Sequence, residues 1–152
     1  MRAVAPGQGR GLSRAPLLGR SRSAARFALA ALFAAAGVNH FVAPEPYVAI
    51  LPPALPWPEA LVYISGAAEL AGALGILFRG TRRFAAAGLI ALLVAVFPAN
   101  IFAALHGMQI SGWDVPEWLL WARLPLQAVL IAWVYLACWR ADGSPRMIPN
   151  ER

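Results

Sequence analysis

The chain has 152 residues, of which 60% are hydrophobic and 13% are charged, and its formal net charge is +6. Its length suits one domain, but its apolar content is too high for an ordinary soluble domain, in which about 45 to 50% of residues are apolar. The positive charge does not indicate nucleic-acid binding, because six arginines are concentrated between residues 2 and 26. That distribution is typical of the cytoplasmic flank of a membrane segment.

Cysteine and histidine usage excludes several classes of metal and redox site. Cys138 is the only cysteine, which rules out an intrachain disulfide, a CxxC pair and a cysteine-based zinc site within one subunit. His40 and His106 lie on separate segments, and the carboxylates show no ligand spacing, so we expect no metal site and no intrinsic cofactor. The chain also lacks a nucleotide-binding loop, a GxSxG motif and a CxxCH haem attachment. If the protein takes part in catalysis, we expect it to be a subunit of an oxidoreductase.

Four apolar segments of membrane-spanning length follow a basic start. Residues 1–23 contain no acidic residue and are rich in Arg, Gly, Ser and Pro, which predicts a disordered tail. A helix needs about 17 to 25 apolar residues to cross a bilayer. The segments that meet this length are 24–42, 60–78, 84–105 and 119–139. We therefore expect a membrane domain at residues 24–140 and a short C-terminal tail at 141–152.

The arginines predict how these segments are oriented. Arg79, Arg82 and Arg83 separate the second segment from the third, and further arginines follow the fourth, whereas the other two loops carry acidic residues and no arginine. The positive-inside rule then places both termini in the cytoplasm. Short connections make successive helices antiparallel, and lipid requires internal backbone hydrogen bonds. We expect an all-α fold, a transmembrane antiparallel four-helix bundle in the inner (plasma) membrane of a bacterium.

The two long loops should lie at the outer surface. Six prolines between residues 44 and 58 exclude one continuous helix there. Residues 45–51 are expected to form a short helical turn, with Tyr47 and Ile50 facing inward. The loop at residues 106–117 contains Gly107, Gly112 and Pro116, which predicts a series of turns.

Polar residues of the apolar segments gather at one depth. Glu69 lies near the middle of the second segment, where a charged side chain costs roughly 2.5 to 3.5 kcal/mol to insert. A rise of about 1.5 Å per residue places the other polar residues in the same outer half. We therefore expect a polar chamber that opens outward, with Glu69 at its floor and Arg123 opposite. The candidate ligand-binding residues are Glu69, Arg123, His40, Asn39, Asn100 and Gln127.

Each of these residues also has a structural interpretation. Direct contact between Glu69 and Arg123 would indicate an ion pair that fixes helix register, whereas a cavity between them would favour a ligand site. His40 can be a hydrogen-bonded residue near the membrane interface. Asn39 and Asn100 can be contacts between helices. Both interpretations remain open from the sequence, although ionisable residues inside a membrane are functional candidates by default.

Four spaced motifs resemble the DoxX family of small bacterial membrane proteins over about residues 26–140. They are NHF at 39–41, SG at 65–66 with Glu69 after it, FPAN at 97–100 and RLPLQ at 123–127. The resemblance implies four transmembrane helices. The family is named after a subunit of a thiosulfate:quinone oxidoreductase, and other members associate with oxidoreductase complexes. More distant relatives carry out thiol redox chemistry with cysteine pairs, which this chain lacks.

The leading hypothesis is an accessory subunit of a membrane-associated redox system, with a site for a quinone or another small ligand. A quinone presents two carbonyl acceptors, to which Arg, Asn and His can donate, and Glu or His can relay protons. An oxidoreductase partner subunit would supply the electron carrier. The alternative is a non-enzymatic scaffold, an assembly factor or a small-solute permeation protein. Permeation would favour a homo-oligomer, because four helices leave little room for a pore. The other expected partner is the lipid bilayer, with no nucleic acid.

Overall fold

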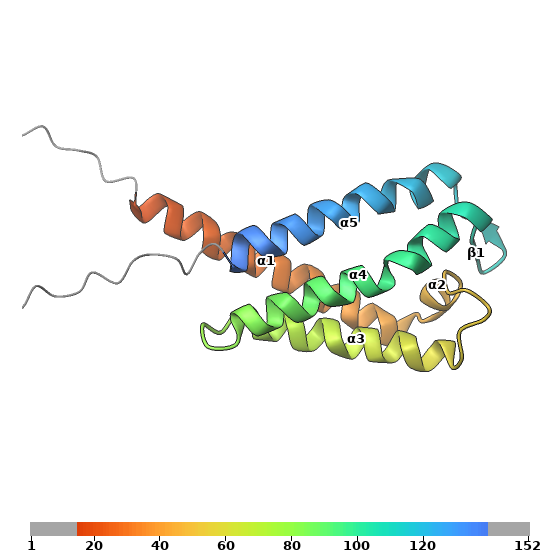
Figure 1. Cartoon of the computed structure of the whole chain (residues 1–152), viewed down its shortest axis with the longest axis horizontal. Coiled ribbons are helices and arrows are strands. Elements are labelled where there is room, and N and C mark those ends of the chain that lie inside the picture. Colours follow the sequence, from red (N-terminus) through yellow and green to blue (C-terminus); the bar gives the residue numbers. More distant parts are fainter. Residues whose placement is uncertain (1–14, 140–152) are drawn as a thin grey trace, which may run out of the picture.

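Helices make up most of the computed structural model, which describes residues 15–139, with side chains from residue 21 onward (Figure 1). The elements are α1 (Ala15–Val42), α2 (Glu45–Val48), α3 (Pro58–Gly75), α4 (Arg82–His106), β1 (Gln109–Ile110), β2 (Trp113–Asp114) and α5 (Glu117–Cys138). The long helix α1 packs against α3 and α5, and α4 packs against the same two helices. The prediction of a mainly helical chain is confirmed.

Among the four long helices, two ends differ from the sequence prediction by three residues or more, and the others differ by at most two. Helix α1 begins at Ala15, so the last part of the predicted N-terminal tail is helical. The rest of that tail and the predicted C-terminal tail at 141–152 lie outside the described residues. Helix α3 ends at Gly75, three residues before the predicted end at residue 78. The break follows a glycine and precedes the arginine-containing turn, where capping contacts satisfy the last carbonyls.

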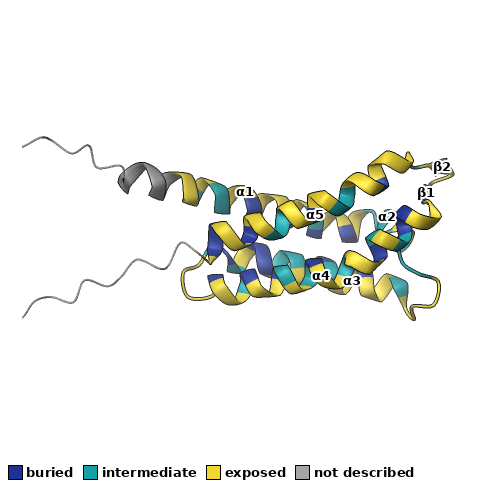
Figure 2. Ribbon diagram, turned by 45° about the horizontal axis from the view of Figure 1, so that its top comes forward, coloured by how far each residue is buried: buried dark blue, intermediate teal, exposed yellow. Residues whose placement is uncertain are grey.

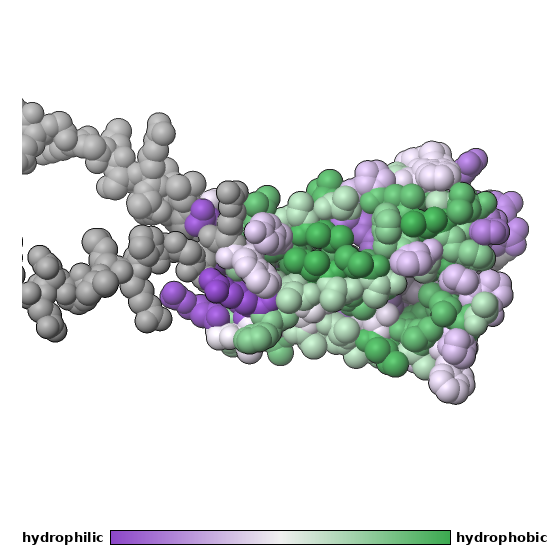
Figure 3. Space-filling view, in the orientation of Figure 1, coloured by the Kyte–Doolittle hydropathy of each residue, from purple (hydrophilic) through white to green (hydrophobic). Residues whose placement is uncertain are grey.

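Three helices are long and apolar enough to cross a membrane: α1 over Ser21–Val42, α4 and α5. Helix α3, the second of the predicted segments, is not among them; its 18 residues include Glu59 and Glu69, which lower its mean hydropathy. The outward faces of the helices are largely exposed (Figure 2) and apolar. Hydrophobic side chains cover most of the visible middle of the molecule, and hydrophilic ones gather mainly at its two ends (Figure 3). An apolar surface of this extent marks contact with lipid or with another protein.

The two ends of the molecule differ in structure. Helix α2 and the β1–β2 hairpin lie at one end, here termed the hairpin end, and the α3–α4 connection lies at the other, here termed the arginine end (Figure 1). At the arginine end, the Thr81 hydroxyl donates to the Gly75 carbonyl at 2.8 Å and Arg82 Nε donates to the Ile76 carbonyl at 3.0 Å. The buried Arg82 thus caps carbonyls that the end of α3 leaves without intrahelical donors.

Turn chemistry shapes the hairpin end. Ser111 and Gly112 join β1 to β2 with φ values of 50° and 83°, the positive values that both central residues of a type I′ turn require. Turns were predicted here, but the strands were not, because each has only two residues. The single turn of α2 carries Pro46 near its start and is closed by the Ala49 amide, which donates to the Glu45 carbonyl at 2.9 Å.

The buried side chains form two apolar clusters. The larger cluster fills the half of the molecule near the arginine end and includes Phe33, Leu89 and Val134. The smaller cluster lies at the hairpin end and includes Ile50 and Leu120. Of the buried polar side chains among the described residues, His40 and Gln127 lie in the hairpin half, whereas Arg82 caps α3 at the arginine end.

A glycine pair brings α1 and α3 into close contact. A Cβ added at Gly66 would lie 2.6 Å from the His40 Cβ and 2.9 Å from the Gly37 carbonyl oxygen. Neither of these neighbours is the free end of a flexible side chain. The absence of a side chain at Gly66 therefore sets how closely His40 approaches α3.

We expect Gly66→Ala to destabilise the protein by about 1 to 3 kcal/mol, because the added methyl group overpacks this contact. The matched control is Gly88→Ala, since a Cβ there meets no heavy atom within 4 Å and alanine is the better helix former. Thermal unfolding followed by circular dichroism in detergent measures both effects. Equal melting temperatures for Gly66→Ala and the unaltered protein would contradict the close packing.

Candidate functional site

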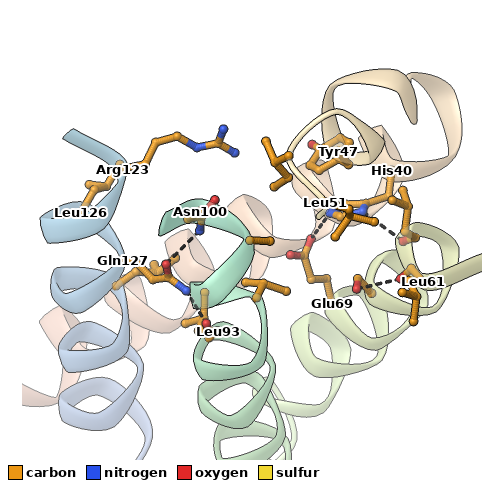
Figure 4. Close-up of a pocket in the computed structure, with 16 residues that line it drawn as sticks. His40, Tyr47, Leu51, Leu61, Glu69, Leu93, Asn100, Arg123, Leu126 and Gln127 are labelled. Carbon is orange, nitrogen blue, oxygen red and sulfur yellow. Dashed lines mark hydrogen bonds and ion pairs between the residues drawn. The ribbon is translucent and has the colours of Figure 1, made fainter. Parts of the chain in front are cut away.

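A cavity of about 230 Å³ opens in the hairpin half of the molecule and is lined by residues of α1 to α5 (Figure 4). Most of the predicted site residues line it. They are His40, Glu69, Asn100, Arg123 and Gln127. Their side chains come from four helices that are distant in sequence, so helix packing brings together residues that the sequence placed only at a similar depth.

The walls of the cavity are mainly aliphatic. Leu51, Leu61, Leu93 and Leu126 line it beside the polar groups (Figure 4). Ligand sites typically combine apolar walls with a few placed polar groups. The volume is below the roughly 300 to 1,000 Å³ of sites for drug-sized ligands, which fits a small molecule of about one substituted ring.

His40 is buried, and contacts hold its ring at one nitrogen and on one face. Nδ1 lies 3.1 Å from the Val62 carbonyl oxygen, and because a carbonyl oxygen can only accept, Nδ1 carries a hydrogen. The ring stacks on Tyr47, with 3.7 Å between the centroids. These contacts fix the imidazole so that Nε2 faces Glu69.

The partner of Glu69 is His40. Glu69 Oε2 lies 3.6 Å from His40 Nε2, and no other ion-pair partner of Glu69 is found among the described residues. With Nδ1 already protonated, one further proton between Nε2 and Oε2 gives either imidazolium and carboxylate or neutral imidazole and carboxylic acid. The pair then has no net charge in either form. This pairing offsets the cost of placing a carboxyl group in an apolar helix.

Arg123 does not contact Glu69. The direct ion pair between these two residues, one of the two interpretations left open by the sequence, does not form in the structure. The two side chains lie on opposite sides of the cavity (Figure 4). Arg123 Nη1 contacts the Met108 sulfur at 3.9 Å, a weak acceptor, and no carboxylate pairs with it among the described residues. Its guanidinium has five N–H donors, so it offers positive charge and donors to the cavity.

A directed chain of hydrogen bonds orients Asn100. Gln127 Nε2 donates to the Leu93 carbonyl oxygen, which can only accept, so Gln127 Oε1 must face the other way. That oxygen accepts from Asn100 Nδ2 at 2.9 Å. Asn100 Oδ1 is left buried without a hydrogen-bond partner. The backbone carbonyl thus fixes both amide orientations.

Asn39 lies outside this cavity. Its Nδ2 donates to the Tyr47 hydroxyl at 2.9 Å, and it lines a neighbouring pocket of about 310 Å³ at the hairpin end. Tyr47 and Arg123 line both spaces. These two side chains therefore form the partition between the main cavity and the outer pocket.

Two polar residues of the cavity were not among the predicted site residues. Tyr47 was expected to face inward, and it does; its signal was an aromatic residue in a short turn between prolines. Ser65 shares a helical face with Glu69, and its hydroxyl donates to the Leu61 carbonyl at 2.9 Å. Ile50 also faces inward as predicted and lines the cavity.

The geometry predicts the tautomer of His40. In ¹⁵N-histidine-labelled protein, His40 should carry a hydrogen on Nδ1 whether it is neutral or charged, because Nδ1 faces a carbonyl oxygen. The His106→Asn variant removes the only other histidine and assigns the signals. The neutral Nε2–H tautomer at His40 would contradict the arrangement with Val62 and Glu69.

Comparison with known proteins gives one match. The family model described as "Domain of unknown function (DUF8561)" matches residues 29–138. The matched segment contains every residue that lines the cavity. No curated protein and no solved structure matches the chain. The resemblance to the DoxX family stays a prediction.

Proposed function

Because the chain belongs to the DUF8561 family, whose description names no activity, we propose a function from its cavity: the protein binds a lipid-soluble ligand of the quinone type in a membrane. We further propose that it acts as an accessory subunit of a redox system. One observation carries the proposal. The Glu69–His40 pair faces Arg123, which has no carboxylate partner among the described residues, across an apolar-walled cavity.

In this proposal all four long helices cross the membrane as an antiparallel bundle. The exposed apolar surface supports the arrangement. Helix α3, with 18 residues, is about 27 Å long at 1.5 Å per residue, close to the hydrocarbon thickness of roughly 30 Å. The positive-inside rule places the arginine end in the cytoplasm of a bacterium. The cavity then lies in the outer half of the bilayer.

The polar groups suit the chemistry of a quinone. Arg123 can donate to one ring oxygen while the aliphatic walls contact the ring. The Glu69–His40 pair holds one proton that can pass to or from the ligand. Reduction of a quinone to a hydroquinone takes up two electrons and two protons, so in this proposal the pair passes one proton to the ligand, takes up another from water and passes that one as well. The electrons are assigned to a flavin, haem or iron–sulfur centre on an oxidoreductase partner subunit, because the sequence contains no carrier-binding motif.

The structure favours ligand binding over solute permeation. A permeation path would have to continue from the cavity through the arginine half of the molecule. That half is filled by fully buried apolar side chains, including Leu29, Phe33 and Leu89. Solute flux through liposomes that contain only this protein would support the permeation alternative instead, and copurification with a soluble oxidoreductase would support the redox role.

We expect purified protein in lipid nanodiscs to bind tetramethylbenzoquinone or its hydroquinone more than empty nanodiscs do. Arg123→Leu and Glu69→Gln should each weaken binding about tenfold or more, which corresponds to 1.4 kcal/mol, because the first removes the guanidinium donors and the second replaces the ionisable carboxyl group that faces His40. Equilibrium dialysis measures the bound fraction.

The matched control for these variants is Gln109→Leu, which replaces an exposed polar side chain that lines neither pocket. It should leave binding unchanged. Equal binding by folded Arg123→Leu and unaltered protein would remove Arg123 from the site. No binding above empty nanodiscs by the unaltered protein would overturn the proposed function.

The membrane arrangement has its own test. A reporter fused after Arg83 should be cytoplasmic, and one inserted at Trp113 should be external, because α3 and α4 both cross in the proposed topology. If α3 did not cross, the segment at Arg83 would lie on the outer side. An external reporter after Arg83 would therefore exclude the four-helix arrangement.

A further inference from the structure

Two buried oxygens of the cavity lie beyond hydrogen-bond distance of any donor among the described residues. Asn100 Oδ1 and Glu69 Oε2 are both buried without a hydrogen-bond partner among the described residues. The other polar atoms that orient them are already used: Gln127 holds the Asn100 amide nitrogen, and Val62 holds the far side of His40. Leaving a buried acceptor unsatisfied is costly, so the occupant of the cavity should supply hydrogen-bond donors.

The orientation of Asn100 is the stronger of these two observations. Rotation of its amide by 180° would place Nδ2 toward the cavity, but it would also set Oδ1 against Gln127 Oε1. Gln127 cannot rotate in compensation, because its nitrogen is held by the Leu93 carbonyl oxygen. The backbone of α4 therefore fixes Oδ1 as the atom of Asn100 that points away from Gln127, and Asn100 lines the cavity (Figure 4).

Arg123 adds the complementary requirement. It lines the same cavity and can only donate. A group that receives from Arg123 and gives to Asn100 must both accept and donate. A hydroxyl group does both, whereas a carbonyl or ether oxygen only accepts.

From this set of donors and acceptors we infer that the cavity is built for the reduced, hydroxyl-bearing form of its ligand, a hydroquinone, in preference to the quinone. The inference rests on the proposed function and names the redox state of its ligand. A hydroquinone hydroxyl donates to Asn100 Oδ1 and accepts from Arg123. A quinone in the same position leaves Asn100 Oδ1 unpaired.

Three ring compounds of similar size test whether the ligand must donate a hydrogen bond or only accept one. They are tetramethylhydroquinone, tetramethylbenzoquinone and the dimethyl ether of the hydroquinone, which keeps the oxygens but has no donor. Binding to the full chain in nanodiscs is measured without oxygen, against empty nanodiscs. The hydroquinone is expected to bind at least about tenfold more tightly than both other compounds.

The Asn100→Leu variant then locates the effect. It removes the acceptor and keeps a side chain of similar size, so the ratio of hydroquinone to dimethyl ether affinity should fall toward one. Gln109→Leu should keep the ratio of the unaltered protein. A full ratio in folded Asn100→Leu would overturn the role of Asn100. Should this variant not fold, the three compounds on the unaltered protein still decide the preference.

The outcomes separate this inference from the proposed function. Equal affinities for the three compounds, or tighter binding of the quinone, would overturn the preference for the reduced form while leaving a ligand site in the cavity. Absence of binding by all three would overturn the proposed function itself. Tighter binding of the hydroquinone alone would support both.

Discussion

The cost of a carboxyl group inside an apolar helix is the constraint on which the hairpin half of the molecule depends. Glu69 meets it through His40 at 3.6 Å, because one proton held between the two side chains would leave the pair without net charge. That solution requires a fixed imidazole, which in turn requires the Val62 carbonyl on one nitrogen and the Tyr47 ring on one face. The short helix α2 is therefore part of the site, because it carries Tyr47.

The same pairing depends on backbone packing. His40 reaches α3 because Gly66 has no side chain and lets α1 approach. The contact between two small residues and the contact between two ionisable ones lie beside each other on the same pair of helices. Packing of α1 on α3 and neutralisation of Glu69 are thus coupled, and a change that separates the helices also removes the partner of the carboxyl group.

The helices could be predicted from hydropathy, proline positions and the distribution of arginines, because these signals lie within each segment and do not depend on how the helices pack. Depth along the helices also identified most of the polar residues that line the cavity. The partner of Glu69 was not predictable in this way. His40 and Arg123 lie at similar depths, and only the rotation of α1 and α5 about their axes decides which one contacts α3. The unpaired oxygen of Asn100 depends on an amide orientation that a backbone carbonyl of α4 sets.

The contact between Glu69 and His40 also affects how easily helix α3 can be buried in an apolar environment. Its mean hydropathy is lower than that of the three other long helices, chiefly because a hydropathy scale assigns each glutamate the value of an isolated charged residue. In the proposed topology Glu59, in the first turn of α3, lies at the interface between membrane and water. Glu69 is the costly one, and pairing with His40 removes its net charge without removing its polarity. Pairing with His40 therefore lowers the free-energy cost of burying α3. It also leaves an ionisable pair at the cavity that Asn100 lines as well, and the Asn100 oxygen has no hydrogen-bond partner among the described residues. A site for a hydrogen-bonding ligand requires polar groups of this kind.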